Sequence, residues 1–168
     1  MGIAVSTYLG QAHVYGDNID TDRIIPGKYT KTLDIDMLAN HVLEDVDPSF
    51  SSRVQSGDIL VAGDNFGAGS SREQAPIAIK ASGIAVVVSS YFARLFYRNA
   101  INIGLPVVEI GSHTIQMGHS VEVDLDNGFV TDQTTGETYI ATRMPDVMIH
   151  ILNSGGLVNY LRDRGDYG

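Results

Sequence analysis

Short apolar runs alternate with helical patterns through the middle of the chain. The run at 84–88 is unbroken and apolar, which is typical of a strand buried on both faces, and we expect parallel neighbours beside it. Around it the pattern predicts two further strands, at 58–62 and from 105, and two helices, one ending near Ser82 and one over 91–103. This alternation predicts the parallel part of a mixed α/β domain.

Three helices in and before this region are expected to present an apolar face to the core. The first, over 34–43, has Asp34 in the position of an N-cap. The residues expected to face the core are Ile35, Leu38, Ala39 and Val42 in the first helix, Ala75, Ala78, Ile79 and Ser82 in the second, and Phe92, Leu95, Phe96, Asn99 and Ile103 in the third.

The two ends of the chain follow a different pattern. The expected elements are a strand at 12–15, a loop over 17–28, an antiparallel meander from residue 120 and a last helix from about Pro145 that is interrupted at Gly155-Gly156. In the meander, Asn127-Gly128 predicts a two-residue hairpin turn. No repeat or linker interrupts the sequence, so residues 1–168 are expected to form a single domain.

Composition and charge narrow the possible functions. The chain has 168 residues, a formal net charge of −9 and a pI of about 4.7. An acidic chain without a run of Lys or Arg is a poor binder of nucleic acid, and no apolar run approaches the roughly 20 residues of a membrane span. We therefore expect a cytoplasmic protein with neither kind of partner.

The chain contains no cysteine. Disulfides, thiolate nucleophiles, Cys-ligated zinc and an iron–sulfur cluster held by this chain are thereby excluded. The five histidines show no metal-binding spacing, so we expect no metal site.

The candidate chemistry lies in a glycine-rich turn after the strand at 58–62. This turn carries Ser70, Ser71 and Arg72 just before a helix, where free backbone N–H groups and the helix dipole favour an anion or an oxyanion. The spacing fits neither a phosphate loop, nor a dinucleotide fingerprint, nor a nucleophile elbow.

A purely structural explanation of the turn competes with the functional one. Ser70 and Glu73 have the spacing of a capping box. A helix capped by Ser70 would, however, place Pro76 beyond its first turn, where proline costs a backbone hydrogen bond. The helix is therefore expected to begin nearer Ala75, although residue chemistry alone leaves both interpretations open.

Three motifs, in the same order along nearly the whole chain, resemble one family. They are GDNIDTDRIIPGKY from Gly16, GSSREQAP from Gly69 and SYFARLFYRN from Ser90, and the run from Gly155 to Leu161 is also similar. They resemble the swivel domain of the aconitase superfamily, in particular the free-standing small subunits of 3-isopropylmalate dehydratase, homoaconitase and 2,3-dimethylmalate dehydratase. The resemblance implies an α/β fold, a swivelling three-layer β/β/α domain of the aconitase C-terminal type.

The same resemblance implies a hydro-lyase subunit that is active only as a heterodimer with a large subunit. It favours 3-isopropylmalate dehydratase of leucine biosynthesis, with a hydroxy di- or tricarboxylate as substrate and a [4Fe–4S] cluster expected on the large subunit. Ser70 corresponds to the family's base, and Ser71 and Arg72 to the residues that bind the substrate carboxylate and oxyanion. The alternatives are a homoaconitase or 2,3-dimethylmalate dehydratase small subunit, or a non-catalytic anion-binding module.

The loop after Pro26 resembles the family's substrate-selecting loop and contributes Tyr29, Lys31 and Thr32 as candidate substrate-binding residues. Three roles for Lys31 stay open. It could meet an extra distal carboxylate of a homoaconitate-type substrate, lie along an apolar substrate side chain with its ammonium in solvent, or be an ordinary surface residue.

Acidic residues before this loop are expected to support the site. Asp17, Asp20 and Asp22 lack the spacing of an EF-hand, so we expect them to accept backbone and arginine hydrogen bonds beside the glycine-rich turn. Arg94 and Arg98 are candidate partners, and Glu73 is a further supporting residue.

Overall fold

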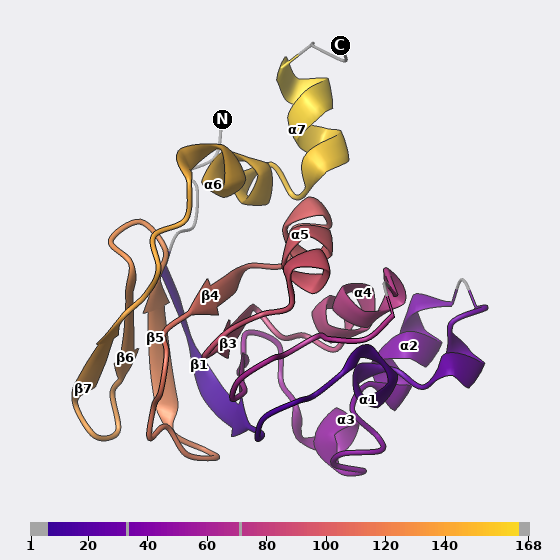
Figure 1. Cartoon of the computed structure of the whole chain (residues 1–168), viewed down its shortest axis with the longest axis horizontal. Coiled ribbons are helices and arrows are strands. Elements are labelled where there is room, and N and C mark those ends of the chain that lie inside the picture. The colour runs from indigo at the N-terminus through magenta and orange to yellow at the C-terminus, as the bar shows by residue number, and fades with distance from the viewer. Residues whose placement is uncertain (1–6, 33, 71, 165–168) are drawn as a thin grey trace.

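The computed structural model describes residues 7–32, 34–70 and 72–164 and contains one seven-stranded sheet (Figure 1). The strands lie in the order β4-β3-β2-β1-β5-β6-β7. Their bounds are Thr7–Val14 (β1), Ile59–Val61 (β2), Val86–Ser89 (β3), Val107–Glu109 (β4), Ser120–Asp124 (β5), Phe129–Asp132 (β6) and Glu137–Ile140 (β7). Strands β1 to β4 pair in parallel and β1, β5, β6 and β7 pair antiparallel, so the long strand β1 joins the two halves.

The helices are short and connect or flank the strands. Their bounds are Thr21–Ile24 (α1), Ile35–His41 (α2), Phe50–Arg53 (α3), Gln74–Ala81 (α4), Arg94–Asn102 (α5), Asp146–Asn153 (α6) and Leu157–Arg164 (α7), with a 3-10 turn at Gly27–Tyr29 (η1). Figure 1 shows α2, α4 and α5 on one side of the parallel strands and β5 to β7 on the other. This is the expected layering of the α/β fold. Within the described residues no helix has the length and apolar character needed to cross a bilayer.

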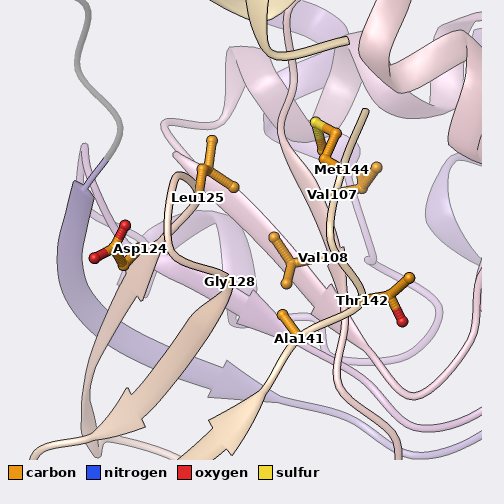
Figure 2. Close-up of a pocket in the computed structure, with 8 residues that line it drawn as sticks. All are labelled: Val107, Val108, Asp124, Leu125, Gly128, Ala141, Thr142 and Met144. Carbon is orange, nitrogen blue, oxygen red and sulfur yellow. The ribbon is translucent and has the colours of Figure 1, made fainter. Parts of the chain in front are cut away.

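The sheet curls, and the curl brings the antiparallel strands over one side of the parallel strands as a separate layer. The Thr142 N–H, just after β7, donates to the Glu109 carbonyl at the end of β4 at 2.9 Å. Figure 2 shows the seam that results, where Val107 and Val108 of β4 lie near Leu125 and Ala141 from the antiparallel half. These four side chains are buried, so the curl closes the core between the two halves of the sheet.

The sequence identified most of the elements, but the first strand, expected at 12–15, spans Thr7–Val14, and two loops also differ from expectation. The loop over 17–28 contains α1, because the Asp20 carboxylate caps that helix by accepting the Arg23 N–H at 2.9 Å, and it also contains the start of η1. The predicted two-residue hairpin turn is wrong. Since Asp124 pairs with Phe129, the loop has four residues, 125–128, and the Asp124 carboxylate accepts the Asn127 N–H at 3.1 Å inside it.

The expected helix faces are correct for most positions. Asp34 caps α2 by accepting the N–H groups of Asp36 and Met37, as its position predicted. Ile35 and Leu95, however, are 55% and 45% exposed in this chain. Both lie at the first or second position of a helix, and both side chains face solvent.

A buried hydrogen bond between a histidine and a carboxylate ties β1 to the start of β2. His13 Nε2 lies 2.7 Å from Asp58 Oδ2, and the two side chains are 3% and 9% exposed. The same carboxylate accepts the backbone N–H groups of Gln11 at 3.3 Å and Gln55 at 3.0 Å. Asp58 therefore organises three donors that come from two separate segments of the chain.

Asp58→Ala is expected to lower the free energy of unfolding of the free chain by about 3 kcal/mol, because it leaves buried donors unpaired. Urea denaturation followed by circular dichroism measures the change. Asp45→Ala, which removes an exposed carboxylate, is the control and should stay within about 0.5 kcal/mol. Equal losses for the two variants would mean that the buried pair contributes nothing specific.

Candidate functional site

The glycine-rich turn lies between two other loops at the carboxyl edge of the parallel strands. On one side it is hydrogen-bonded to the segment after β1, through Gly67 N to Ile19 O and Thr21 N to Ala68 O, both at 2.8 Å. On the other side Phe66 N donates to Tyr91 O at 3.1 Å, in the segment after β3. Three segments far apart in the sequence thus meet at the edge of the sheet where α/β proteins usually carry their sites.

Close packing explains the glycines of this turn. Gly67 has φ +85°, and a Cβ there would lie 2.4 Å from the Cβ of Phe96, which belongs to α5. Gly69 has φ +99° and faces Thr21 of α1. A side chain at Gly67 would collide with Phe96, and at Gly69 the positive φ would strain any other residue, so glycine at both positions lets the turn lie against its neighbours.

The structure excludes one of the two interpretations of Ser70. Helix α4 begins at Gln74, so Ser70 is not its N-cap and the capping-box interpretation is wrong. Pro76 is the third residue of α4, inside the first turn, where its missing N–H costs nothing. The expectation that the helix begins near Ala75 is confirmed, and Glu73 is the exposed residue just before the helix, with no side-chain cap bond.

Ser70 itself is exposed and contacts the side chain of Thr21. The Thr21 hydroxyl donates to the Ser70 carbonyl at 3.0 Å, and Thr21 Oγ1 lies 3.3 Å from Ser70 Oγ. Since Thr21 is 3% exposed, it is a fixed partner for a serine side chain that faces solvent. Ser71, the other serine expected to take part, lies outside the described residues.

Arg72 is held by α1, the helix that also contacts Ser70, and by the segment after it. Its Nη1 lies 2.5 Å from Asp22 Oδ1 and donates to the Ile25 carbonyl at 3.2 Å. The guanidinium also lies against Gly27, where a Cβ would be 3.3 Å from Nη2. In the described part of the chain both polar contacts of the Arg72 guanidinium use Nη1. Its remaining N–H groups can therefore donate to a ligand.

The supporting acidic residues have the expected kind of role but different partners. Asp17 accepts the Asp64 N–H at 2.8 Å, Asp20 caps α1, and Asp22 pairs with Arg72. The expectation that Arg94 is one of these partners is wrong. It forms an ion pair with Glu109 and lies over the rings of Tyr91 and Tyr97, because α5 begins on the far side of the turn from α1.

The loop after Pro26, which was expected to select the substrate, lies beside Arg72, and its three candidate residues differ in environment. Lys31 is exposed, whereas the Thr32 hydroxyl accepts the Asp34 N–H at 3.0 Å before α2. Tyr29 is half-buried, and its ring stacks on the imidazole of His41. The loop is joined to α4 where Gln74 Nε2 donates to the Thr30 carbonyl at 3.0 Å.

Sequence reasoning missed several residues that shape this site. Thr21 stands inside the first family motif, but nothing in its local pattern distinguishes it from the acidic residues around it. His41 and Gln74 make contacts across 12 and 44 positions of the sequence, and helix periodicity gives no sign of either. Their roles become visible only when the three segments are brought together.

Comparison with known proteins agrees with this architecture. A model of the aconitase C-terminal domain matches residues 34–112. The chain is 54% identical to the 3-isopropylmalate dehydratase small subunit of Caldicellulosiruptor bescii, over 92% of this chain and 95% of the relative. It is 53% identical to the 2,3-dimethylmalate dehydratase small subunit of Eubacterium barkeri, over 90% and 94%. A crystal structure of 3-isopropylmalate dehydratase from Methanocaldococcus jannaschii matches with a TM-score of 0.91, at 46% identity over 95% of each chain.

These similarities extend well beyond the three motifs. They cover the glycine-rich turn, the substrate-selecting loop and both halves of the curled sheet, at an identity of about one residue in two. The resemblance inferred from the motifs is thereby confirmed, together with the α/β fold that it implied. The chain belongs to the aconitase C-terminal (swivel) domains, within the family of 3-isopropylmalate dehydratase small subunits.

Proposed function

We propose that the chain is the small subunit of a 3-isopropylmalate dehydratase, a hydro-lyase that moves a hydroxyl group between neighbouring carbons of a dicarboxylate. The observation that carries this proposal is the placement of Ser70. Its hydroxyl is exposed at the carboxyl edge of the parallel strands, beside the buried Thr21 and two residues before Arg72. The relatives of this name support the choice of substrate.

In this proposal Ser70 is the catalytic base. Its Oγ takes the proton from the carbon beside a substrate carboxylate, a carbon–carbon double bond forms, and hydroxide leaves the neighbouring carbon and takes up a proton as water. Addition of water in the opposite sense gives the isomer. Because a serine alkoxide is costly, the positive charge of Arg72 and the N-terminus of α4 are needed to stabilise it.

The remaining residues hold the substrate. Arg72 can bind a carboxylate through the edge of its fork that does not contact Asp22, and Ser71 is proposed to assist it. Lys31 and Thr32 would lie near the substrate side chain, because the loop that carries them is joined to α4 just after Arg72. Asp20 and Asp22 act indirectly by fixing α1 and Arg72.

The chain's own residues do not fit an iron–sulfur cluster. It has no cysteine, and nowhere in the described segments do three His, Asp or Glu side chains form a group that could hold a metal ion. We therefore assign the [4Fe–4S] cluster to a large subunit, where it would act as a Lewis acid on the substrate hydroxyl. The heterodimer with that subunit, and its cytoplasmic location, are part of the same proposal.

Reconstitution tests the function. The chain is mixed with its cognate large subunit under anaerobic conditions that rebuild the cluster, and the absorbance of the alkene is followed with 3-isopropylmalate, homocitrate or 2,3-dimethylmalate. Turnover of 3-isopropylmalate by the mixture, and by neither subunit alone, supports the proposal. If none of the three substrates reacts, the chain is better described as an anion-binding module.

A second substrate has a specific observation in its favour. The 2,3-dimethylmalate dehydratase small subunit of Eubacterium barkeri is nearly as similar to this chain as the 3-isopropylmalate dehydratase relatives. The two substrates differ in the apolar group that the substrate-selecting loop would meet. Turnover of 2,3-dimethylmalate in preference to 3-isopropylmalate would transfer the assignment to that enzyme.

Lys31→Gln is expected to leave kcat/KM for 3-isopropylmalate within about threefold of wild type, because an exposed ammonium gains little from an apolar side chain. The same change should lower kcat/KM for homocitrate, or raise its inhibition constant as a competitive inhibitor, by about tenfold if Lys31 meets its extra carboxylate. Glutamine keeps most of the stem, so the comparison isolates the charge. Equal effects on both compounds would contradict a role in recognising the distal carboxylate.

A further inference from the structure

Three side chains behind the substrate-selecting loop contact one another in a closed arrangement. The Tyr29 ring stacks on the His41 imidazole, with centroids 4.0 Å apart and planes 9° from parallel. His41 Nδ1 lies 2.7 Å from Glu44 Oε2, and the Tyr29 hydroxyl is near enough to Glu44 to help lower the pKa of its carboxyl. We call these residues the Tyr29–His41–Glu44 triangle; it joins the loop to the C-terminal end of α2.

The triangle matters because few other contacts among the described residues hold this part of the loop. After the three residues of η1, residues 30–32 have no regular structure, and Lys31 is exposed. The Thr30 hydroxyl donates to the Gly27 carbonyl at 2.8 Å, inside the same loop, and Gln74 attaches the Thr30 carbonyl to α4. The position of Lys31 relative to Arg72 therefore depends on the anchors at residues 29 and 30.

The electrostatics of the triangle keep its acceptor charged. Burial alone would raise the pKa of Glu44, but hydrogen bonds from His41 and Tyr29 and the nearby charges of His41 and Lys28 lower it. Glu44 is thus an ionised acceptor at neutral pH. Its bond to Nδ1 fixes the plane of the imidazole, and so fixes the surface on which Tyr29 stacks.

We propose that His41 is a positioning residue for substrate selection, which acts through Tyr29 to set where Lys31 and Thr32 meet the substrate side chain. Tyr29 then belongs to the positioning machinery, since its ring and its hydroxyl are both engaged by residues behind the loop. The inference rests on the proposed function, in which this loop contacts the substrate. It places a determinant of selectivity on α2, outside the loop itself.

The test uses the assembled heterodimer. His41→Ala removes the stacking surface and is expected to raise KM for 3-isopropylmalate about tenfold, with kcat within about twofold, and to change the kcat/KM ratio between 3-isopropylmalate and 2,3-dimethylmalate at least about threefold. His41→Phe keeps a ring for Tyr29 and should recover most of the KM and of the ratio. His150→Ala, at an exposed histidine on α6, is the matched control and should resemble wild type.

Three outcomes would overturn the inference. His41→Ala with wild-type KM and wild-type substrate ratio would show that the triangle does not act on the substrate. A loss of kcat in step with a fall in the Tm of the free chain, without rescue by His41→Phe, would show a purely structural role. A wild-type heterodimer that turns over neither substrate would overturn the proposed function as well, whereas the first two outcomes leave that function standing.

Discussion

Ser70→Ala is expected to lower kcat of the assembled heterodimer by at least about 10³-fold, the largest effect of any single change in this chain. The hydroxyl is the only part of the side chain that can accept the substrate proton, and alanine removes it without altering the backbone. KM should stay within about threefold, because Arg72 and the loop still hold the substrate. Alkene absorbance under steady-state conditions measures both constants.

Ser51→Ala provides the matched control, since Ser51 is an exposed serine on α3, away from the glycine-rich turn. It should leave kcat unchanged, and the Tm of the Ser70→Ala chain should match wild type because Ser70 is exposed. Retention of more than about a tenth of the wild-type kcat by Ser70→Ala would show that another group is the base. The active site would then need a base from the large subunit.

The parallel half of the fold was predictable from local pattern alone. An unbroken apolar run such as 84–88 has few alternatives to a strand covered on both faces, and Val86 to Ser89 are indeed buried between parallel neighbours. Pro76 limited where α4 could begin, and the structure agrees. Both cases depend on interactions within a few residues, which a sequence displays directly.

The features that sequence reasoning got wrong depend on distant contacts or very short segments. Helix α1 has four residues, too few to produce a periodic pattern, and the hairpin loop 125–128 is closed by a side chain and not by the Asn-Gly pair alone. Helical spacing at Leu95 showed that a helix exists there but could not show that this side chain faces solvent.

The candidate site divides in the same way. The glycine-rich turn could be recognised as a candidate site from the residues themselves, but a capping box explained Ser70 and Glu73 equally well until the start of α4 was known. The partners of its residues could not be recognised. Thr21 lies 49 positions from Ser70, Arg72 pairs with Asp22, and the expected partner Arg94 pairs with Glu109 instead. Such pairings depend on which loops the sheet brings together.

Arg72→Lys is expected to lower kcat/KM for 3-isopropylmalate by about 10²-fold. Lysine keeps the charge but loses the planar fork, so it cannot hold Asp22 and a substrate carboxylate at the same time. Part of the loss should appear in kcat, because in the proposed mechanism the guanidinium also stabilises the Ser70 alkoxide, and a lysine ammonium would place its charge elsewhere. Arg143→Lys, at an exposed arginine before α6, is the control and should be neutral.

Asp22→Asn separates the two roles that Arg72 can have. Asp22→Asn removes the Arg72–Asp22 ion pair and keeps the guanidinium, whereas Arg72→Lys removes the guanidinium and keeps a cation. If Arg72 binds the substrate, Asp22→Asn should cost less than about fivefold in kcat/KM, since Asp22 is 67% exposed and an exposed pair contributes little. A loss as large as that of Arg72→Lys would mean that Arg72 acts by anchoring α1, and the carboxylate site would then have to be formed by the large subunit.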